Sequence, residues 1–161
     1  MMAIHNSVFI GEHSIIGEDV QILEDSKIWH YCNIYGCTIG RNTQIGSYSE
    51  IKSGVRVGDN CRFQSYVFVS EGTQIGNHVF LGPRVTILND KYPSAIKAIN
   101  KTWRLVPVIL EDEVSIGGNV TILPGIRIGR GTMVGGGSVV TKNIPPGEIW
   151  FGNPAKRYEK R

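Results

Sequence analysis

The sequence predicts an all-β fold, a parallel β-helix of short strands and tight corners, and three observations lead to it. Aliphatic residues recur every six positions from Ile4 to Ile28. Glycine directly follows ten of the eighteen aliphatic residues in the repeat. A second residue, small enough for its side chain to point into the core, lies two places before each aliphatic residue, as Val20 does before Ile22. A period of six fits neither a helix nor long alternating strands, so it indicates an internal repeat.

The repeat occupies most of the chain in three parts. The first covers residues 4–34, the second covers 39–81 after one five-residue step, and the third begins at Leu110 and ends near Val140. Each six-residue unit predicts one short strand and one corner, and three units predict one coil of a stack. About eighteen units give about six coils, or roughly 30 Å at the spacing of paired strands. Glycine is expected at corners because it adopts backbone angles that other residues avoid.

The repeat stops once, between Ile87 and Leu110. We expect an inserted loop at about 88–107 that lies outside the stack and carries Tyr92 and Trp103. Insertions of this length in compact domains are usually functional, and large aromatic side chains are uncommon in idle surface loops. The loop is therefore expected to contact substrate, with a tolerated surface insertion as the alternative.

The remaining residues complete a single domain, as the length also predicts. We expect this domain to cover residues 1–161, with a short C-terminal cap at about 143–161. Cys32, Cys37 and Cys61 each lie two places before a ladder aliphatic residue. They are most simply small core residues, and metal ligation or nucleophilic catalysis are the alternatives.

Composition and charge exclude several classes of function. The chain is 41% hydrophobic with a net charge of +3, and no apolar run approaches the ~18 residues of a membrane span. The N-terminus enters the repeat directly, without a signal peptide, so we expect a cytoplasmic protein. Basic residues gather in AKRYEKR at the C-terminus, without interleaved aromatic residues. We therefore expect neither membrane nor nucleic acid binding.

Two segments near the C-terminus carry a family resemblance. SIGGNVTILPGIRIG at 115–129 and GGGSVVTKNIPPGEIWFGNPAKR at 135–157 resemble the last coils and cap of coenzyme A-dependent hexapeptide acyltransferases. This resemblance implies a left-handed helix and a homotrimer with acetyl-CoA between neighbouring prisms. SKIWHY at 26–31 and GPRVTILNDKYP at 82–93 are similar to the N-acetyltransferases of nucleotide-linked 3-amino sugars.

The residues after GPRVT point to the type of acceptor. Sugar O-acetyltransferases and chloramphenicol-type transferases place a catalytic histidine shortly after a similar segment. Here Asn89 and Asp90 occupy that region, and no histidine follows His78. An amine with a pKa near about 8 needs less help from a base than a hydroxyl does. We expect Asn89 to orient the amine and the departing thiolate to accept its proton, with Asp90 as a reserve base.

The histidine in SKIWHY is the candidate for contact with the nucleotide. His30 lies on a face that the repeat reaches again at Ser47, Ser65 and Pro83. This spacing predicts about three coil steps, or roughly 14 Å, between His30 and the turn before Asn89. The resemblance implies nucleotide sugar there, with His30 donating to a phosphate or a sugar hydroxyl; a plain surface histidine is the alternative. Further substrate-binding residues are expected at Gln64, Tyr66, Tyr92 and Trp103.

Coenzyme A is expected beside the later coils. Glycines at these corners would let a pantetheine arm approach, and exposed amides could hold the thioester oxyanion. Basic side chains near the C-terminus would bind phosphates, although a solvated basic end is an alternative. The residues expected to bind acetyl-CoA are Gly118, Gly136, Lys142, Lys156 and Arg157. No metal is expected, because the four histidines form no close pair of the kind that the γ-class carbonic anhydrases use for zinc.

The sequence therefore predicts an N-acetyltransferase that transfers the acetyl group of acetyl-CoA to the 3-amino group of a UDP- or dTDP-linked sugar. One alternative is a sugar or small-alcohol O-acetyltransferase that uses Asp90 or a histidine of a neighbouring chain as base. Another is a noncatalytic trimeric scaffold with the same fold.

Overall fold

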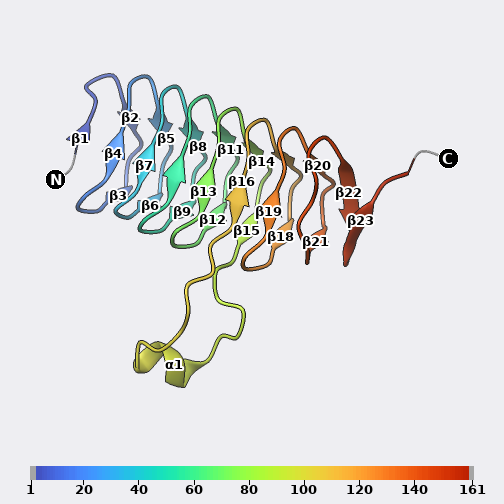
Figure 1. The fold of residues 1–161 in the computed structure, drawn as a ribbon. Helices are drawn as coiled ribbons and strands as arrows, with labels where there is room; N and C mark the ends of the chain where they lie inside the picture. The colour runs from blue at the N-terminus through green and yellow to red at the C-terminus, as the bar shows by residue number, and fades with distance from the viewer. Residues whose placement is uncertain (1–2, 160–161) are drawn as a thin grey trace.

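The computed structural model describes residues 3–159 and shows a triangular prism of stacked coils, with the two ends of the chain at opposite ends of the stack (Figure 1). Two-residue strands follow one another around the prism, and each pairs in parallel with the strand one coil away. The predicted all-β class and parallel β-helix are confirmed, and the architecture is consistent with the left-handed form.

The strands form three sheets, one on each face of the prism. Sheet A contains, in spatial order, β1 (Ala3–Ile4), β4 (Gln21–Ile22), β7 (Thr38–Ile39), β10 (Arg56–Val57), β13 (Gln74–Ile75), β16 (Ile109–Leu110) and β19 (Arg127–Ile128). Sheet B contains β2 (Phe9–Ile10), β5 (Lys27–Ile28), β8 (Gln44–Ile45), β11 (Arg62–Phe63), β14 (Phe80–Leu81), β17 (Ser115–Ile116), β20 (Met133–Val134), β22 (Ile149–Gly152) and β23 (Ala155–Arg157). Sheet C contains β3 (Ile15–Ile16), β6 (Asn33–Ile34), β9 (Glu50–Ile51), β12 (Phe68–Val69), β15 (Thr86–Ile87), β18 (Thr121–Ile122) and β21 (Val139–Val140).

The chain turns from sheet A to sheet B, from B to C and from C to A, and we call these turns corners AB, BC and CA. Sheets A and C are 7-stranded, so the described prism has seven coils before β22 begins the next one. The sequence predicted about six coils. The expected eighteen units fall short of the 21 ladder residues that β1 to β21 carry, three in each of seven coils, with the fully buried Ile87 and Val140 among them.

The core is the aliphatic ladder that the repeat predicted. Strand register places ladder residues directly over one another, as Ile28 lies over Ile45 and Ile45 over Phe63. From Ile22 onward the ladder residues are fully or nearly fully buried, so each removes apolar surface from water, typically worth about 1.5–3 kcal/mol per large side chain. Trp150 pairs with Val134 and closes the C-terminal end of the core.

Glycine serves the corners in two ways, of which the sequence predicted one, the positive φ that Gly54 adopts at 72°. The glycines that follow the ladder residues lack positive φ angles, and Gly46 is an example. A Cβ atom on Gly46 would lie 2.4 Å from the carbonyl carbon of Gln64 in the next coil. Two residues later, positive φ is adopted mostly by other residue types, such as Tyr48 (62°) and Asn60 (59°). Glycine is therefore required there by the close approach of coils, not by backbone angle.

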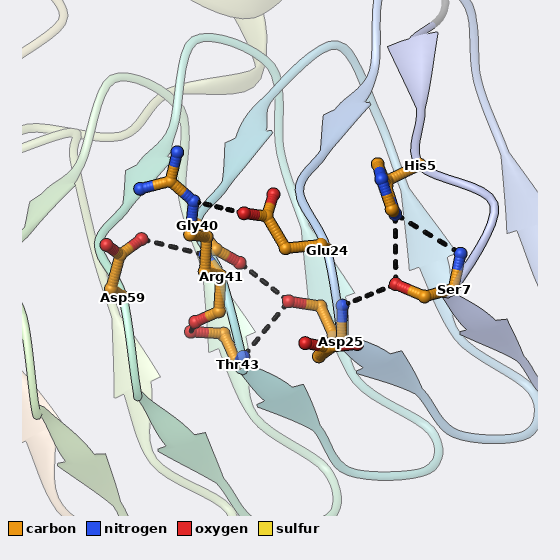
Figure 2. A network of polar contacts seen from close by, with 9 residues as sticks. His5, Ser7, Glu24, Asp25, Gly40, Arg41, Thr43 and Asp59 are labelled. Atoms are coloured by element: carbon orange, nitrogen blue, oxygen red, sulfur yellow. Dashed lines mark hydrogen bonds and ion pairs between the residues drawn. The ribbon is translucent and has the colours of Figure 1, made fainter.

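Corner AB is stabilised by polar contacts between successive coils (Figure 2). The Ser26 hydroxyl donates to the Gly40 carbonyl at 2.6 Å and accepts from the Thr43 amide at 3.0 Å. The backbone amide of Arg41 donates to Asp59 Oδ1 at 2.7 Å, and the Arg41 guanidinium lies 2.6 Å from the Glu24 carboxylate. These polar groups satisfy one another and tie successive coils together at this corner.

The insertion leaves the prism at corner CA, between β15 and β16, and projects to one side (Figure 1). The amide of Val106 donates to the carbonyl of Asn89 at 2.9 Å and joins the two ends of the loop. The loop contains the one helix in the described residues, α1 (Ala95–Ile99), which has no buried side chain and is too short to cross a membrane. Because β15 pairs with β18 and β13 with β16, the stack continues without a break.

Candidate functional site

A pocket of about 240 Å³ lies at corner CA, where the insertion leaves the prism. It is lined by residues of the prism and by residues of the insertion. The lining consists of Lys52, Phe68, Ser70, Glu71, Asn89, Asp90, Ala98 and Trp103. Three residues expected at the site, Asn89, Asp90 and Trp103, therefore lie together, and we call this hollow the Asn89 pocket.

Asn89 is held from several sides. The preceding amide, that of Leu88, continues sheet C by donating to the Ile122 carbonyl at 3.0 Å. The side chain of Asn89 lies over the corner of the coil before it, where Nδ2 donates to the Glu71 carbonyl at 3.4 Å. Together with the backbone bond to Val106, these contacts fix the carboxamide, so its Oδ1 atom remains as an oriented acceptor.

Asp90 begins the insertion with a local turn. Its Oδ1 atom accepts a hydrogen bond from the amide of Tyr92 at 2.9 Å, which leaves the second carboxylate oxygen available. Tyr92 lines a neighbouring hollow of about 530 Å³ that also contains Asp90. Lys97 donates to the Tyr92 carbonyl at 3.3 Å, and its ammonium lies 5.9 Å from the centre of the Tyr92 ring. Tyr92 is thus beside the Asn89 pocket but does not line it.

Two residues of the pocket were not predicted from the sequence. The ammonium of Lys52 lies 3.2 Å from Glu50 and 4.4 Å from the centre of the Tyr35 ring. Ser70 is buried, and its hydroxyl is the one buried side-chain polar atom in the described residues without a hydrogen-bond partner. Ser70 follows the ladder residue Val69, the place that glycine occupies in many units, and this departure was the available signal.

His30 lies at corner BC, which follows β5. Its Nδ1 atom accepts a hydrogen bond from the amide of Glu12 in the preceding coil at 2.9 Å. An imidazole nitrogen that accepts carries no proton, so in the neutral ring the proton is on Nε2. His30 therefore presents a donor to its surroundings.

Tyr66 belongs to a stack of side chains along corner BC. Ring centres are 5.0 Å apart between Tyr31 and Tyr48 and 4.9 Å apart between Tyr48 and Tyr66, and the planes are nearly parallel. The guanidinium of Arg84 lies 5.7 Å from the Tyr66 ring centre and continues the stack. Neighbouring groups cover both faces of the Tyr66 ring, so Tyr66 presents its ring edge and its hydroxyl. Gln64 lies two places before Tyr66 at the same corner.

The three-coil spacing from His30 to the turn before Asn89 agrees with the structure, but Asn89 itself lies at another corner of the prism. Counting from His30 through Ser47 and Ser65 to Pro83 follows corner BC correctly. Strand β15 then carries the chain along sheet C, so Asn89 lies at corner CA instead. Each six-residue unit moves the chain to the next corner of the prism, so residues 83 and 89 lie at different corners. His30, Gln64 and Tyr66 thus form one group, and Asn89, Asp90 and Trp103 form another.

The residues expected to bind acetyl-CoA are also divided. Gly118 and Gly136 lie at corner BC, and their amides donate no hydrogen bond within residues 3–159. Lys142 lies at corner CA, where its ammonium is 5.1 Å from the Trp150 ring centre.

The other two basic residues lie on β23. Arg157 Nε is 3.4 Å from Glu148, and the exposed Lys156 contributes to a hollow of about 500 Å³ formed by the end of the chain. Lys142 and Arg157 therefore already have partners at the C-terminal end of the prism.

The cysteines lie inside the prism, as the repeat predicted. Burial raises the pKa of the Cys37 thiol to about 12, and burial also raises the pKa of Cys32 and Cys61. These thiols are therefore protonated near neutrality and unsuited to nucleophilic attack. Within residues 3–159, no three histidine, cysteine or acidic residues lie close enough together to hold a metal ion.

Comparison with known families decides the relationship of the chain. The family described as "GMPPB C-terminal domain" matches residues 1–109, more than half of the sequence. The chain belongs to this family. Residues 107–142 match a second family, described as "Bacterial transferase hexapeptide (six repeats)". The two matches together cover the strands from β1 to β21.

Curated relatives of this chain include both an O-acetyltransferase and an N-acetyltransferase. The chain is 40% identical over 80 residues to a galactoside O-acetyltransferase of Lactococcus lactis, covering 49% of this chain and 39% of the relative. It is 50% identical over 50 residues to a 2,3,4,5-tetrahydropyridine-2,6-dicarboxylate N-acetyltransferase of Staphylococcus aureus, covering 31% of this chain and 21% of the relative. The chain thus spans well under half the length of these relatives.

A solved structure shares the fold. The hexapeptide-repeat acetyltransferase of Vibrio cholerae, crystallised with acetyl coenzyme A, superposes with a TM-score of 0.61 at 23% identity. The match covers 95% of this chain and 70% of that one.

Proposed function

We propose that this protein is an acetyl-CoA-dependent N-acetyltransferase that acts on the 3-amino group of a nucleotide-linked sugar carrying UDP or dTDP. The observation that carries the proposal is the Asn89 pocket, which is built by the insertion and contains a fixed carboxamide but no histidine. Such a site lacks the usual base for a hydroxyl but suits an amine, which is a free nucleophile for part of the time near neutrality.

In the proposed reaction the amine attacks the carbonyl carbon of the thioester. The new carbon–nitrogen bond forms, the carbon–sulfur bond breaks, and the departing thiolate takes the proton that the nitrogen loses. Asn89 orients the amine through Oδ1. The free amides of Gly118 and Gly136 are the candidates for holding the oxyanion.

The two separated groups of residues support a homotrimer. Corners BC and CA are different edges of one prism, so His30 and Asn89 of one chain do not form a single site. In a cyclic trimer, corner BC of one protomer can face the insertion of the next. The groove between them would hold acetyl-CoA and the nucleotide sugar, with His30 donating to a phosphate or sugar hydroxyl and Tyr92 and Trp103 covering the acceptor.

A single domain of residues 1–161 supplies all of these groups, with the insertion at about 88–107 and the cap at about 143–161. Lys142, Lys156 and Arg157 would face the phosphates of coenzyme A. The three free cysteines fit a reducing compartment, and we place the reaction in the cytoplasm. No metal takes part in the proposed chemistry.

O-acetylation is the second candidate, and the likeness to a galactoside O-acetyltransferase favours it. It would require Asp90, or His30 of a neighbouring protomer, to remove a hydroxyl proton. The tautomer of His30 argues against that role, because the accepting Nδ1 is occupied by Glu12.

The test incubates the full chain with acetyl-CoA and a panel of UDP- and dTDP-linked 3-amino sugars, with the matching 3-hydroxy sugars as controls. Release of free thiol only with amino sugars supports the proposal. Release only with hydroxy sugars supports O-acetylation, and release with neither would refute acetyl transfer to this class.

A further inference from the structure

Ser70 is an exception among the buried hydroxyl groups of the described chain. Every other buried serine or threonine hydroxyl donates to a backbone carbonyl, as Ser26 does to Gly40 and Ser138 does to Gly135. The same holds for Thr43, Ser49, Thr73 and Thr132. Ser70 is 3% exposed, and its Oγ atom has no partner.

The location of this exception is informative. A buried hydroxyl without a hydrogen bond is unfavourable and calls for a specific explanation. Ser70 lines the Asn89 pocket, and none of the residues with a bonded hydroxyl lines it. A ligand in this pocket would supply the missing partner.

The polar groups of the pocket indicate which ligand fits. Nδ2 of Asn89 donates to the Glu71 carbonyl, which leaves Oδ1 of Asn89 able to accept a hydrogen bond. Asp90 keeps one carboxylate oxygen, and the Glu71 carboxylate forms no ion pair within the described residues. The single cation, Lys52, is already paired with Glu50. Acceptors therefore outnumber free donors around the hollow.

An amino group complements this arrangement. It offers two N–H donors as an amine and three as an ammonium, whereas a hydroxyl offers one and a phosphate dianion offers none. When two N–H groups of a neutral amine bind Ser70 Oγ and Asn89 Oδ1, the nitrogen lone pair is left free to attack.

We propose that the Asn89 pocket binds the acceptor's amino group, with Ser70 as a binding residue, and prefers that group to a hydroxyl. The inference deepens the proposed function and rests on it, because it places the amine of the sugar in this pocket and the nucleotide phosphates outside it.

The first experiment compares Ser70→Ala with the matched variant Ser26→Ala. Ser70→Ala removes a hydroxyl that has no partner in the free protein, so the midpoint of thermal unfolding stays the same or rises. The KM for the amino sugar nucleotide increases about tenfold, the worth of one ordinary hydrogen bond, while the KM for acetyl-CoA is unchanged. Ser26→Ala breaks two hydrogen bonds at corner AB, so it lowers the unfolding midpoint and leaves both KM values alone. An unchanged KM for the amino sugar nucleotide in Ser70→Ala would overturn the inference.

The second experiment separates this inference from the proposed function, because it measures binding without turnover. Saturation-transfer NMR on the full chain compares 3-amino-3-deoxy-D-glucose with D-glucose at millimolar concentration. We expect the amino sugar to bind about tenfold more tightly than glucose, and Ser70→Ala to lose most of that preference. Equal binding of the two sugars, or binding of neither, refutes the inference whatever the enzyme acetylates. Selective binding through Ser70 without any acetylation would refute the proposed function and leave the inference standing.

Discussion

The backbone amide of Glu12 donates a 2.9 Å hydrogen bond to Nδ1 of His30, across two successive coils of corner BC. This bond occupies the lone pair with which His30 would accept a proton at Nδ1 and leaves the N–H at Nε2 as its outward group. The contact therefore favours a donor to substrate over a general base.

The first prediction follows for His30→Ala. The variant should lose one donor to a phosphate or hydroxyl, so the KM for the nucleotide sugar should rise about tenfold while kcat stays near that of the wild type. Steady-state kinetics on the purified protein measures both. Exposed His78, at corner AB, provides the matched control, and His78→Ala should leave both constants unchanged. If His30→Ala abolishes kcat while substrate affinity is intact, histidine is the base and the proposed mechanism is wrong.

The second prediction concerns Asn89→Ala. The carboxamide orients the amine and accepts from it through Oδ1 as positive charge develops on the nitrogen, so its loss should lower kcat by about 100- to 1,000-fold, the cost of removing one preorganised hydrogen bond in the transition state. Acetyl-CoA binding, measured by calorimetry, and the oligomeric state should not change. Asn6→Ala, at the exposed corner AB, is the control and should behave like the wild type. Undiminished turnover in Asn89→Ala would remove this residue from the chemistry.

The sequence predicted the fold well because burial in a stacked prism repeats the same requirement in every coil. The six-residue spacing identified the ladder, and only the count of coils was low, because 21 units and not about eighteen make up the stack. The reason offered for glycine was incomplete. Spacing alone does not show that the next coil passes within 2.4 Å of where a Cβ on Gly46 would lie.

The site was predicted only in part. Asn89, Asp90 and Trp103 come together because the insertion begins and folds back at one corner. The three-coil spacing from His30 to the turn before Asn89 was correct, but a count of coils along the stack does not say which edge of the prism Asn89 itself occupies. Ser70 was missed, because the state of its hydroxyl depends on contacts that appear only in three dimensions.

The third prediction concerns coenzyme A. Lys142→Met keeps an apolar chain against Trp150 and removes the charge, and Arg157→Gln removes the ion pair to Glu148. Each should raise the KM for acetyl-CoA, because charge-assisted bonds to phosphate are commonly worth about 1.5–3 kcal/mol. Arg56→Gln, on the outer face of sheet A, is the control with the same loss of charge. If Lys142→Met and Arg157→Gln both leave this KM unchanged, the phosphates bind elsewhere.

The fourth prediction concerns the thiols. Burial raises the pKa of Cys37 from 9.0 to about 12, so the folded state disfavours its thiolate. The stability that comes with the neutral thiol is complete below about pH 9 and is lost as the pH rises toward about 12. Urea unfolding at pH 8, 9.5 and 10.5 should show a falling free energy of unfolding, and Cys37→Ala should reduce the slope. A thiol reagent at pH 8 should label no cysteine before unfolding; rapid labelling of Cys37 in the native protein would contradict its burial.

The bond formed in the product tests the central claim most directly. The protein of residues 1–161 is incubated with acetyl-CoA and a UDP- or dTDP-linked 3-amino sugar, and the product is analysed by mass spectrometry before and after mild alkali. The proposed function predicts one acetyl group, attached to the 3-nitrogen as an amide, that survives the alkali. An acetyl group lost in alkali, as an ester would be, or no acetylated sugar at all, would contradict it.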